Sequence, residues 1–471
     1  MTSNDHANTE RLVFPTRVSR KEKLTWETRN RPALTGVNTS IGASITVFCL
    51  YFAGLHTALN LSLGAGVPIP YLLCGIACVL SLYIGAAQMR GISLKESWPL
   101  VTYVILAVMV TAVAAESDYV TRSAKGILQL FYSLTVAICL YFLVLSIPRD
   151  RMTSLCLILL TIMAVASVLE SVPLLREYFD SVGEWLSPDW FSSNDLRDEL
   201  IHGATRAKIL SPEPSVAATS FFWVSMLFSW CWRPNLKQGL WWGATAMILL
   251  FTVRSPIVII GIALSVIAIY WFRMANQKAR SSLGTNIALL VLLVLVAIGV
   301  SFVAYNIFEA RLESILSGEG SFSMRVSGAL QFAADYAIRH PWFGTGVVGD
   351  LEMLSEEIVG FYRSIGMGSG FDISTYGGWV TARKGLSNDI ALHFVYFGGI
   401  GGLVAGGLLL RVLKLSNRWL WTMLVFQIFT FSMASGGYNS APIWCIGASL
   451  LAAAKLKEVS LEGGTAVPLQ T

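Results

Sequence analysis

Two arginines occupy positions where the chain could hold an anion at a membrane boundary. Arg254 lies between two apolar runs in the sequence FTVRSP. A charged side chain at that depth is costly unless it reaches the interface or meets an anion. Arg325 follows Ser321 and Ser323, which could cap a helix, and it falls in the first turn, where a cation opposes the helix dipole. Both positions predict an anionic partner, with a snorkelling arginine as the alternative for Arg254 and a solvated surface for Arg325.

The predicted helix that starts near Arg325 runs to Ile338, before the His340-Pro341 stop. Its spacing predicts an apolar stripe and a second face. The stripe is Val326, Leu330, Ala333 and Ala337, and the second face is Arg325, Gly328, Phe332, Asp335 and Arg339. Arg339 lies about 21 Å from Arg325 along such a helix, too far for both to grip one diphosphate easily. Arg339 and His340 are substrate-binding candidates, although a structural role is favoured for Arg339.

Two polar turns could bind an acceptor hydroxyl. Glu213 stands between two prolines in SPEPS, which fix the backbone around its carboxylate. Pro214 could simply open a helix, and a role for Glu213 as base or hydroxyl acceptor is equally open. Arg383, Ser387 and Asn388 in RKGLSN are substrate-binding candidates at the bilayer surface, and Ser387 and Asn388 could instead cap the next helix. Capping is the simpler interpretation of this pair.

The sequence gives little support for a metal site or for disulfide bonds. All seven cysteines lie inside apolar runs and the five histidines are scattered, so neither a disulfide framework nor a zinc site is predicted. Glu116 and Asp118 form an acidic pair that could contribute to a metal site, but a solvated turn is the simpler interpretation. We expect no cofactor.

The elements that must position these residues are membrane helices. The 471 residues are 54% hydrophobic and 13% charged, and mean hydropathy is +0.61. Apolar runs recur at about the 20 residues needed to cross a bilayer. The sequence therefore predicts an all-α polytopic integral membrane protein of about twelve spans. The spans are 37–55, 67–88, 98–115, 124–147, 152–173, 212–232, 238–253, 255–272, 284–306, 387–410, 419–435 and 438–454.

The distribution of Lys and Arg orients these spans. Every short loop assigned to the cytoplasmic side carries at least two of them, and the basic tail 1–36 carries seven. We therefore expect both termini, including the tail 456–471, to be cytoplasmic. Spans 1–9 occupy 37–306 with an outer loop at 174–211, and spans 10–12 occupy 387–455. The long outer loop 307–386, with helices, lies between spans 9 and 10, and a loop of this length is uncommon without a function.

The order of three motifs resembles the bacterial superfamily of O-antigen ligases and O-antigen or exopolysaccharide polymerases. The motifs are TVRS around Arg254, Arg325 followed by HPWFGTG at 340–346, and Asn388 followed by Gly398 and Gly401. The resemblance implies inverting, metal-independent glycosyl transfer from an undecaprenyl-diphosphate-linked saccharide. It implies that Arg254 and Arg325 bind the diphosphate and that Glu213 assists the acceptor.

Within this superfamily the sequence favours a polymerase. Ligases carry a histidine before the asparagine of the third motif, and this chain has Ser387 there. The implied partners are lipid-linked donor and acceptor, the bilayer, a chain-length regulator and a flippase, with no nucleic acid. The implied location is the bacterial inner membrane, with the site facing the periplasm. A ligase remains the alternative of the same chemistry. A flippase or other transporter, and a structural partner of an export machine, are alternatives of other classes.

Overall fold

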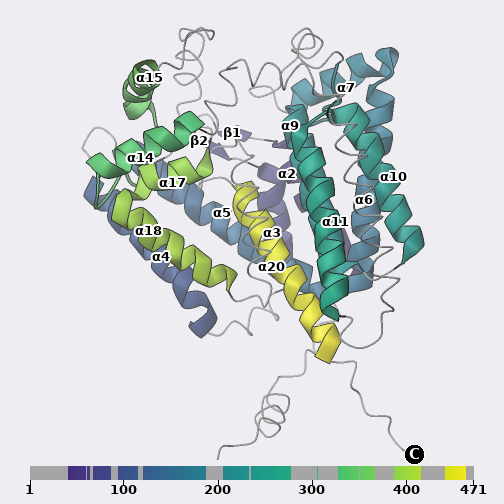
Figure 1. Cartoon of the computed structure of the whole chain (residues 1–471). Helices are drawn as coiled ribbons and strands as arrows, with labels where there is room; N and C mark the ends of the chain where they lie inside the picture. The colour runs from purple at the N-terminus through teal and green to yellow at the C-terminus, as the bar shows by residue number, and fades with distance from the viewer. Residues whose placement is uncertain are drawn as a thin grey trace, which may run out of the picture. The chain divides into compact units, whose positions relative to one another are not determined.

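Figure 1 shows the computed structural model of the chain. The structure describes residues 41–59, 61–63, 67–69, 71–85, 94–114, 120–186, 205–232, 235–276, 305, 327–348, 351–365, 386, 388–414 and 441–462. All of them belong to one compact unit, Thr39–Thr471.

The secondary structure of these residues is helical apart from one short hairpin. The helices are α2 (Ile41–Thr57), α3 (Leu72–Gly85), α4 (Leu94–Ala114), α5 (Val120–Ser146), α6 (Arg149–Glu170), α7 (Pro173–Leu186), α9 (Pro214–Cys231), α10 (Leu236–Val253), α11 (Pro256–Asn276), α14 (Ala329–Arg339), α15 (Ser355–Ser364), α17 (Asp389–Phe397), α18 (Gly399–Leu413) and α20 (Ala441–Glu462). A 3₁₀ turn spans Glu352–Leu354, and β1 (Leu61–Leu63) pairs antiparallel with β2 (Val67–Ile69).

Most of the predicted spans coincide with helices. Spans 1, 3 to 8 and 12 each fall on a single helix, whereas span 9, except for residue 305, and span 11 lie outside the described residues. Two of the described helices, α5 and α6, are long and apolar enough to cross a membrane by length and composition. A helical architecture that suits a membrane protein is thus confirmed, and the number of crossings stays a prediction.

Several helices expose apolar side chains in lines along one face. On α4, Val101, Ile105, Met109 and Val113 are exposed at intervals of four residues. On α6, Ile158, Ile162, Val165 and Leu169 form a comparable exposed line. Water-soluble monomers rarely expose contiguous apolar patches of this extent. Such lines are compatible with helices of a membrane protein.

The predicted start of span 2 at residue 67 is wrong. Residues Val67–Ile69 form strand β2, with Leu61 opposite Ile69 and Leu63 opposite Val67. Pro68 and Pro70 disfavour helical backbone in the residues that precede them, so α3 begins only at Leu72.

The predicted faces of the 325–338 helix also need correction. In the structure α14 begins at Ala329, and its buried residues are Ala329, Phe332, Ala333 and Tyr336. Phe332, assigned to the second face, is fully buried, because a large aromatic ring gains more from burial than the neighbouring small residues do. Ser321, Ser323 and Arg325 lie outside the described residues.

Span 10 was predicted as one helix, and the structure divides it at Gly398. The backbone there has φ of +74°, which glycine tolerates and other residues rarely adopt. The segment HPWFGTG at 340–346 lies against this break. The carbonyls of His340, Pro341 and Trp342 accept the amides of Gly399, Ile400 and Gly401 at 3.1, 2.7 and 3.2 Å.

The other end of the same segment caps α17. The amides of Thr345 and Gly346 donate to the carbonyls of Val395 and Tyr396, both at 3.0 Å. One segment thus satisfies the free carbonyls at the end of α17 and the free amides at the start of α18. The second and third sequence motifs therefore form one structural unit in which each supports the other.

Two clusters of buried apolar side chains hold the helices together. The first joins α2, α3, α5, α6, α9, α10, α11 and α20, and fully buried Trp223 and Trp230 of α9 belong to it. The second joins α4, α14, α17 and α18 with the first half of α5, and Phe332 and Phe397 belong to it. Because α5 contributes to both clusters, it links the two sets of helices.

Gly344 gives a direct test of the unit around Gly398. A Cβ at Gly344 would lie 1.9 Å from the carbonyl oxygen of Val395, whereas one at Gly407 on α18 would meet nothing within 4 Å. We expect Gly344→Ala to destabilise the folded protein by roughly 2 kcal/mol or more, since backbone must move to admit the methyl group. The midpoint temperature of the detergent-solubilised protein would measure it. Gly407→Ala is the matched control, and an equal effect of both changes would contradict the proposed packing.

Candidate functional site

The candidate site is built around an unusual turn before α9, residues 206–211, which we call the turn. Ile209 and Leu210 have φ of 55° and 63°, so two successive residues with side chains adopt the left-handed conformation. Such backbone costs of order 1 kcal/mol or more per residue and persists only when its surroundings hold it. The turn leads into Ser211 and Glu213 at the start of α9.

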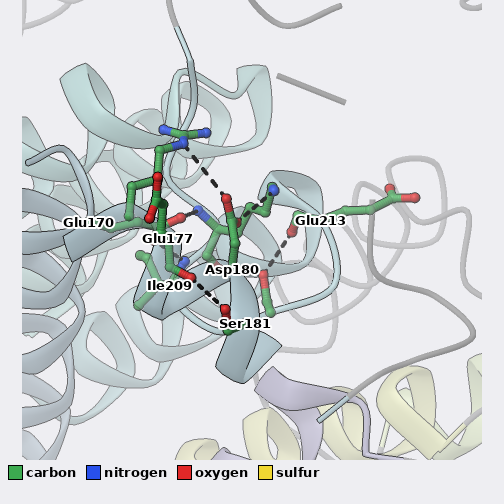
Figure 2. A network of polar contacts seen from close by, with 9 residues as sticks. Glu170, Glu177, Asp180, Ser181, Ile209 and Glu213 are labelled. Atoms are coloured by element: carbon green, nitrogen blue, oxygen red, sulfur yellow. Dashed lines mark hydrogen bonds and ion pairs between the residues drawn. The ribbon is translucent and has the colours of Figure 1, made fainter. Parts of the chain in front are cut away.

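Glu170 at the end of α6 holds this turn. Its two carboxylate oxygens accept the backbone amides of Lys208 at 2.9 Å and of Ile209 at 2.6 Å. The side chain is buried, and a buried carboxylate is tolerated when several donors surround it. Figure 2 shows Glu170 beside Ile209 in this network.

His56 of α2 supports the turn from the other side. Its Nε2 lies 2.6 Å from the carbonyl oxygen of Ile209, and its Nδ1 lies 3.0 Å from the Oγ of Ser220 on α9. A carbonyl can only accept, so Nε2 carries a proton, and in the neutral imidazole Nδ1 then accepts from the hydroxyl of Ser220. Both ring nitrogens are thus used in contacts within the protein, which fits a structural role for His56.

An ion pair connects the turn to α7. The Nζ of Lys208 lies 3.0 Å from Oδ1 of Asp180, and Arg176 lies 3.9 Å from Oδ2 of the same carboxylate. Lys208 is 2% exposed, so its ammonium group pairs with Asp180 inside the protein and does not face a ligand. α7 is thereby attached to the turn as well as to the end of α6.

Arg254 is presented by the end of α10. It has φ of 46° and ψ of 50°, a left-handed helix end, and its Nε donates to the carbonyl of Phe251 at 3.2 Å. The amide of Ala207 donates to the carbonyl of Thr252 at 2.9 Å. This bond joins the turn to the last residues of α10, with Arg206 one residue before Ala207 and Arg254 two residues after Thr252. Both side chains are partly exposed.

Glu213 directly precedes α9, and Pro214 occupies its first helical position. This helix start is one of the two alternatives that the sequence predicts for the SPEPS run. The carboxylate of Glu213 makes no capping bond; Oε2 accepts from the hydroxyl of Ser215 at 3.1 Å. In Figure 2 the carboxylate of Glu213 points away from Glu170 and Asp180. Its side chain thus points away from the carboxylates of the structural network, although its backbone is part of the turn.

An apolar cavity of about 470 Å³ lies between α6 and α10. Its lining is Thr161, Ala164, Val165, Val168, Leu169, Trp241, Ala244, Thr245 and Ile248. Along α10, Ile248 lies about 9 Å from Arg254 and Trp241 about 20 Å. The cavity thus runs along the helix that ends in Arg254.

The remaining predicted residues fall elsewhere. Asn388 caps α17, accepting the amides of Ile390 and Ala391 at 3.0 and 3.1 Å, as the simpler interpretation predicted. Arg339 pairs with Asp335 at 2.9 Å and with Glu357 at 2.5 Å, and the bond with Glu357 raises the pKa of its guanidinium. The exposed ring of His340 stacks on Tyr336 at 4.3 Å.

The structure thus connects the end of α10, which carries Arg254, to the turn that precedes Glu213. Arg339 and His340 lie at the end of α14, and Asn388 lies at the start of α17. Arg383 and Ser387, like Arg325, lie outside the described residues. Sequence reasoning missed Arg206 and Lys208, although both stand directly before the SPEPS run that it singled out.

Within the described part of the chain, no group of three or more His, Cys, Asp or Glu side chains could hold a metal ion. Comparison with known proteins adds no assignment, because no family model and no curated protein matches the sequence. Function must therefore be argued from the residues of this chain.

Glu170→Gln tests whether the carboxylate holds the turn. An amide offers one acceptor oxygen, so one of the two backbone amides would lose its partner, at a cost of about 1–3 kcal/mol. We expect faster hydrogen exchange at residues 207–210 and a lower midpoint temperature. Glu177→Gln, a change on exposed α7 surface, should leave both unchanged. Unaltered exchange in Glu170→Gln would show that the turn is held by other contacts.

Proposed function

We propose that this chain is an inverting, metal-independent glycosyltransferase that polymerises undecaprenyl-diphosphate-linked saccharide repeat units. The observation that carries the proposal is the hydrogen bond from Ala207 to Thr252, which joins the segment that carries Arg206 to the end of α10 that carries Arg254. Glu213 begins the helix that follows the same turn. Two cations and a carboxylate so placed suit an anionic donor and a hydroxyl acceptor.

The arginine pair would act on the leaving group. A lipid diphosphate carries its charge on oxygens that a guanidinium can bind with two parallel hydrogen bonds. That charge increases as the glycosidic oxygen leaves, so preorganised cations stabilise the transition state more than the ground state. Arg325, which lies outside the described residues, is proposed as a further diphosphate ligand on the strength of the sequence motif.

The proposed step is a single displacement. A hydroxyl oxygen of the acceptor saccharide attacks the anomeric carbon of the donor, and the bond from that carbon to the diphosphate oxygen breaks. Undecaprenyl diphosphate departs with the bonding electrons, and the configuration at the anomeric carbon inverts. The hydroxyl proton passes to a base, for which we propose Glu213 because its carboxylate faces away from the structural network.

The apolar cavity between α6 and α10 supports a lipid-linked donor. Its lining is apolar apart from two threonines and the indole N–H of Trp241, which is bonded to Thr161, and it extends along α10, the helix that ends at Arg254. An isoprenoid tail lying there would leave its diphosphate at the arginine pair. The cavity therefore fits an amphiphile whose charged and apolar parts are joined end to end.

The proposal includes the predicted topology. With twelve spans and cytoplasmic termini, the end of α10 and the start of α9 face the periplasm of the bacterial inner membrane. A chain-length regulator and a flippase would be its partners there. The apolar lines exposed on α4 and α6 support the placement of these helices in lipid.

A polymerase is favoured over a ligase by Ser387, which replaces the histidine that ligases carry at the corresponding place. A transporter is less well supported. Charged groups lining a path through the membrane are what a transporter needs. Glu170, the main charge within the predicted spans, is occupied by the amides of Lys208 and Ile209.

Substitution of the arginines tests the proposal. In a deletion strain that carries the full chain, Arg254→Ala and Arg206→Ala should each lower polymer synthesis by roughly 10²-fold, the loss typical of one oxyanion-stabilising group. Electrophoretic chain-length profiles would then show single repeat units. Arg411→Ala removes an exposed arginine that stacks on Trp98 at 5.2 Å and is the matched control.

Three outcomes separate the alternatives in this experiment, with expression matched by immunoblot. Single repeat units in both variants support polymerisation through the arginine pair. Polymer of normal length that is no longer attached to lipid A indicates a ligase. Normal, attached polymer in both variants would overturn the proposed site.

Independence from metal is a separate prediction. Because the proposed stabilisation of the diphosphate comes from arginines, polymerisation by the purified chain should continue unchanged in excess chelator. The measurement is product length with lipid-linked repeat units, with and without the chelator. Loss of activity that divalent cations restore would instead favour a metal-dependent transferase, for which Glu116 and Asp118 are the candidates.

A further inference from the structure

α7 exposes an apolar face that points away from the rest of the protein. Leu174, Tyr178 and Trp185 are four and seven residues apart, which places them on one side of the helix. They are 89%, 68% and 78% exposed. Gly183 on the opposite side is buried. The helix is thus turned so that its large apolar side chains meet whatever surrounds the protein.

This orientation is fixed by the protein. Asp180 pairs with Lys208 of the turn at 3.0 Å, and Arg176 lies 3.9 Å from the same carboxylate. Figure 2 shows Asp180 directed toward the turn. Because this charged side is attached to the candidate site, the apolar side cannot rotate inward without breaking a partly buried ion pair.

The apolar face continues the exposed surface of α6. Val165 and Leu169 are exposed near the end of α6, Val172 is exposed at the connection, and Leu174 follows on α7. α6 is one of the helices whose length and composition allow it to cross a membrane. The same medium that covers the exposed side of α6 therefore reaches α7.

The composition of α7 identifies the medium. Tyr and Trp are enriched where a membrane meets water, because their rings are amphipathic. The charges of α7 are Arg176, Glu177, Asp180 and Glu184, so the helix is acidic and gains nothing from anionic lipid. Burial of apolar side chains must supply the binding energy.

We propose that α7 lies in the plane of the outer membrane interface, with Leu174, Tyr178 and Trp185 inserted among phospholipid chains. The pair of Asp180 and Lys208 then sets the depth of the turn that carries Arg206. The partner is a phospholipid bilayer, recognised through its acyl and glycerol region. The inference depends on placement of α6 in a membrane and is independent of glycosyl transfer.

Photochemical crosslinking tests the proposal on the full chain in phosphatidylcholine vesicles. Benzoylphenylalanine replaces Leu174 or Tyr178 in two variants, and replaces Glu177 or Glu184 on the charged side in two controls. After irradiation, mass spectrometry counts lipid adducts. We expect lipid adducts at Leu174 and Tyr178, and at least roughly fivefold fewer at the controls, since an inserted helix buries one face only. Addition of anionic lipid should not raise the yield.

Equal adduct yields at all four positions would overturn the proposal, as would adducts to protein in place of lipid at Leu174 and Tyr178. A second measurement needs no crosslinker. The fluorescence of wild type minus that of Trp185→Phe isolates Trp185 among the 15 tryptophans. Brominated phosphatidylcholine should quench this difference signal, and an unquenched signal would place Trp185 in water and contradict insertion.

Discussion

The candidate site is organised by one buried carboxylate that accepts hydrogen bonds from two backbone amides. Glu170 binds the amides of Lys208 and Ile209, and it thereby holds two left-handed residues that would otherwise relax. Everything near the turn depends on that geometry. The bond from Ala207 to Thr252 ties the segment with Arg206 to the end of α10, and the turn leads into the start of α9.

A buried acidic residue in a helix is usually taken as a proton carrier or an ion ligand. Here its oxygens are saturated by backbone donors, while His56 satisfies the carbonyl of Ile209 from the opposite side. The polar groups near the end of α6 therefore divide into those that shape the backbone and those that remain partly exposed. The arginine pair and the carboxylate of Glu213 belong to the second group, and the proposed chemistry uses only these.

Helices could be predicted well from the sequence because long apolar runs have few alternatives to helix in or near lipid. The errors arose where a single residue type overrides hydropathy. Pro68 and Pro70 turned the predicted start of span 2 into a strand, and Gly398 divided span 10. The effect of the prolines is local. The break at Gly398 also depends on the distant segment at 340–346, which bonds to both sides of it and which no local sequence pattern predicts.

The site could be predicted only in part for a related reason. Arg254 and Glu213 were recognisable because prolines and apolar runs set them apart. Arg206 gains its place from one hydrogen bond between backbone atoms 45 residues apart in sequence, and no side-chain pattern encodes such a bond. Asn388 was recognised as a helix cap because capping depends on neighbouring residues alone.

The unit around Gly398 has a consequence for how this sequence can diverge. Its hydrogen bonds join backbone groups, so they do not depend on the side chains of exposed Trp342 and Phe343. Gly344 and Gly398, by contrast, have no room for a side chain. Substitution of the aromatic residues of this motif should therefore be tolerated, whereas the spacing of the glycines should be kept. Searches for distant relatives should weight that spacing, and the 51 residues between Gly346 and Gly398, above the aromatic residues themselves.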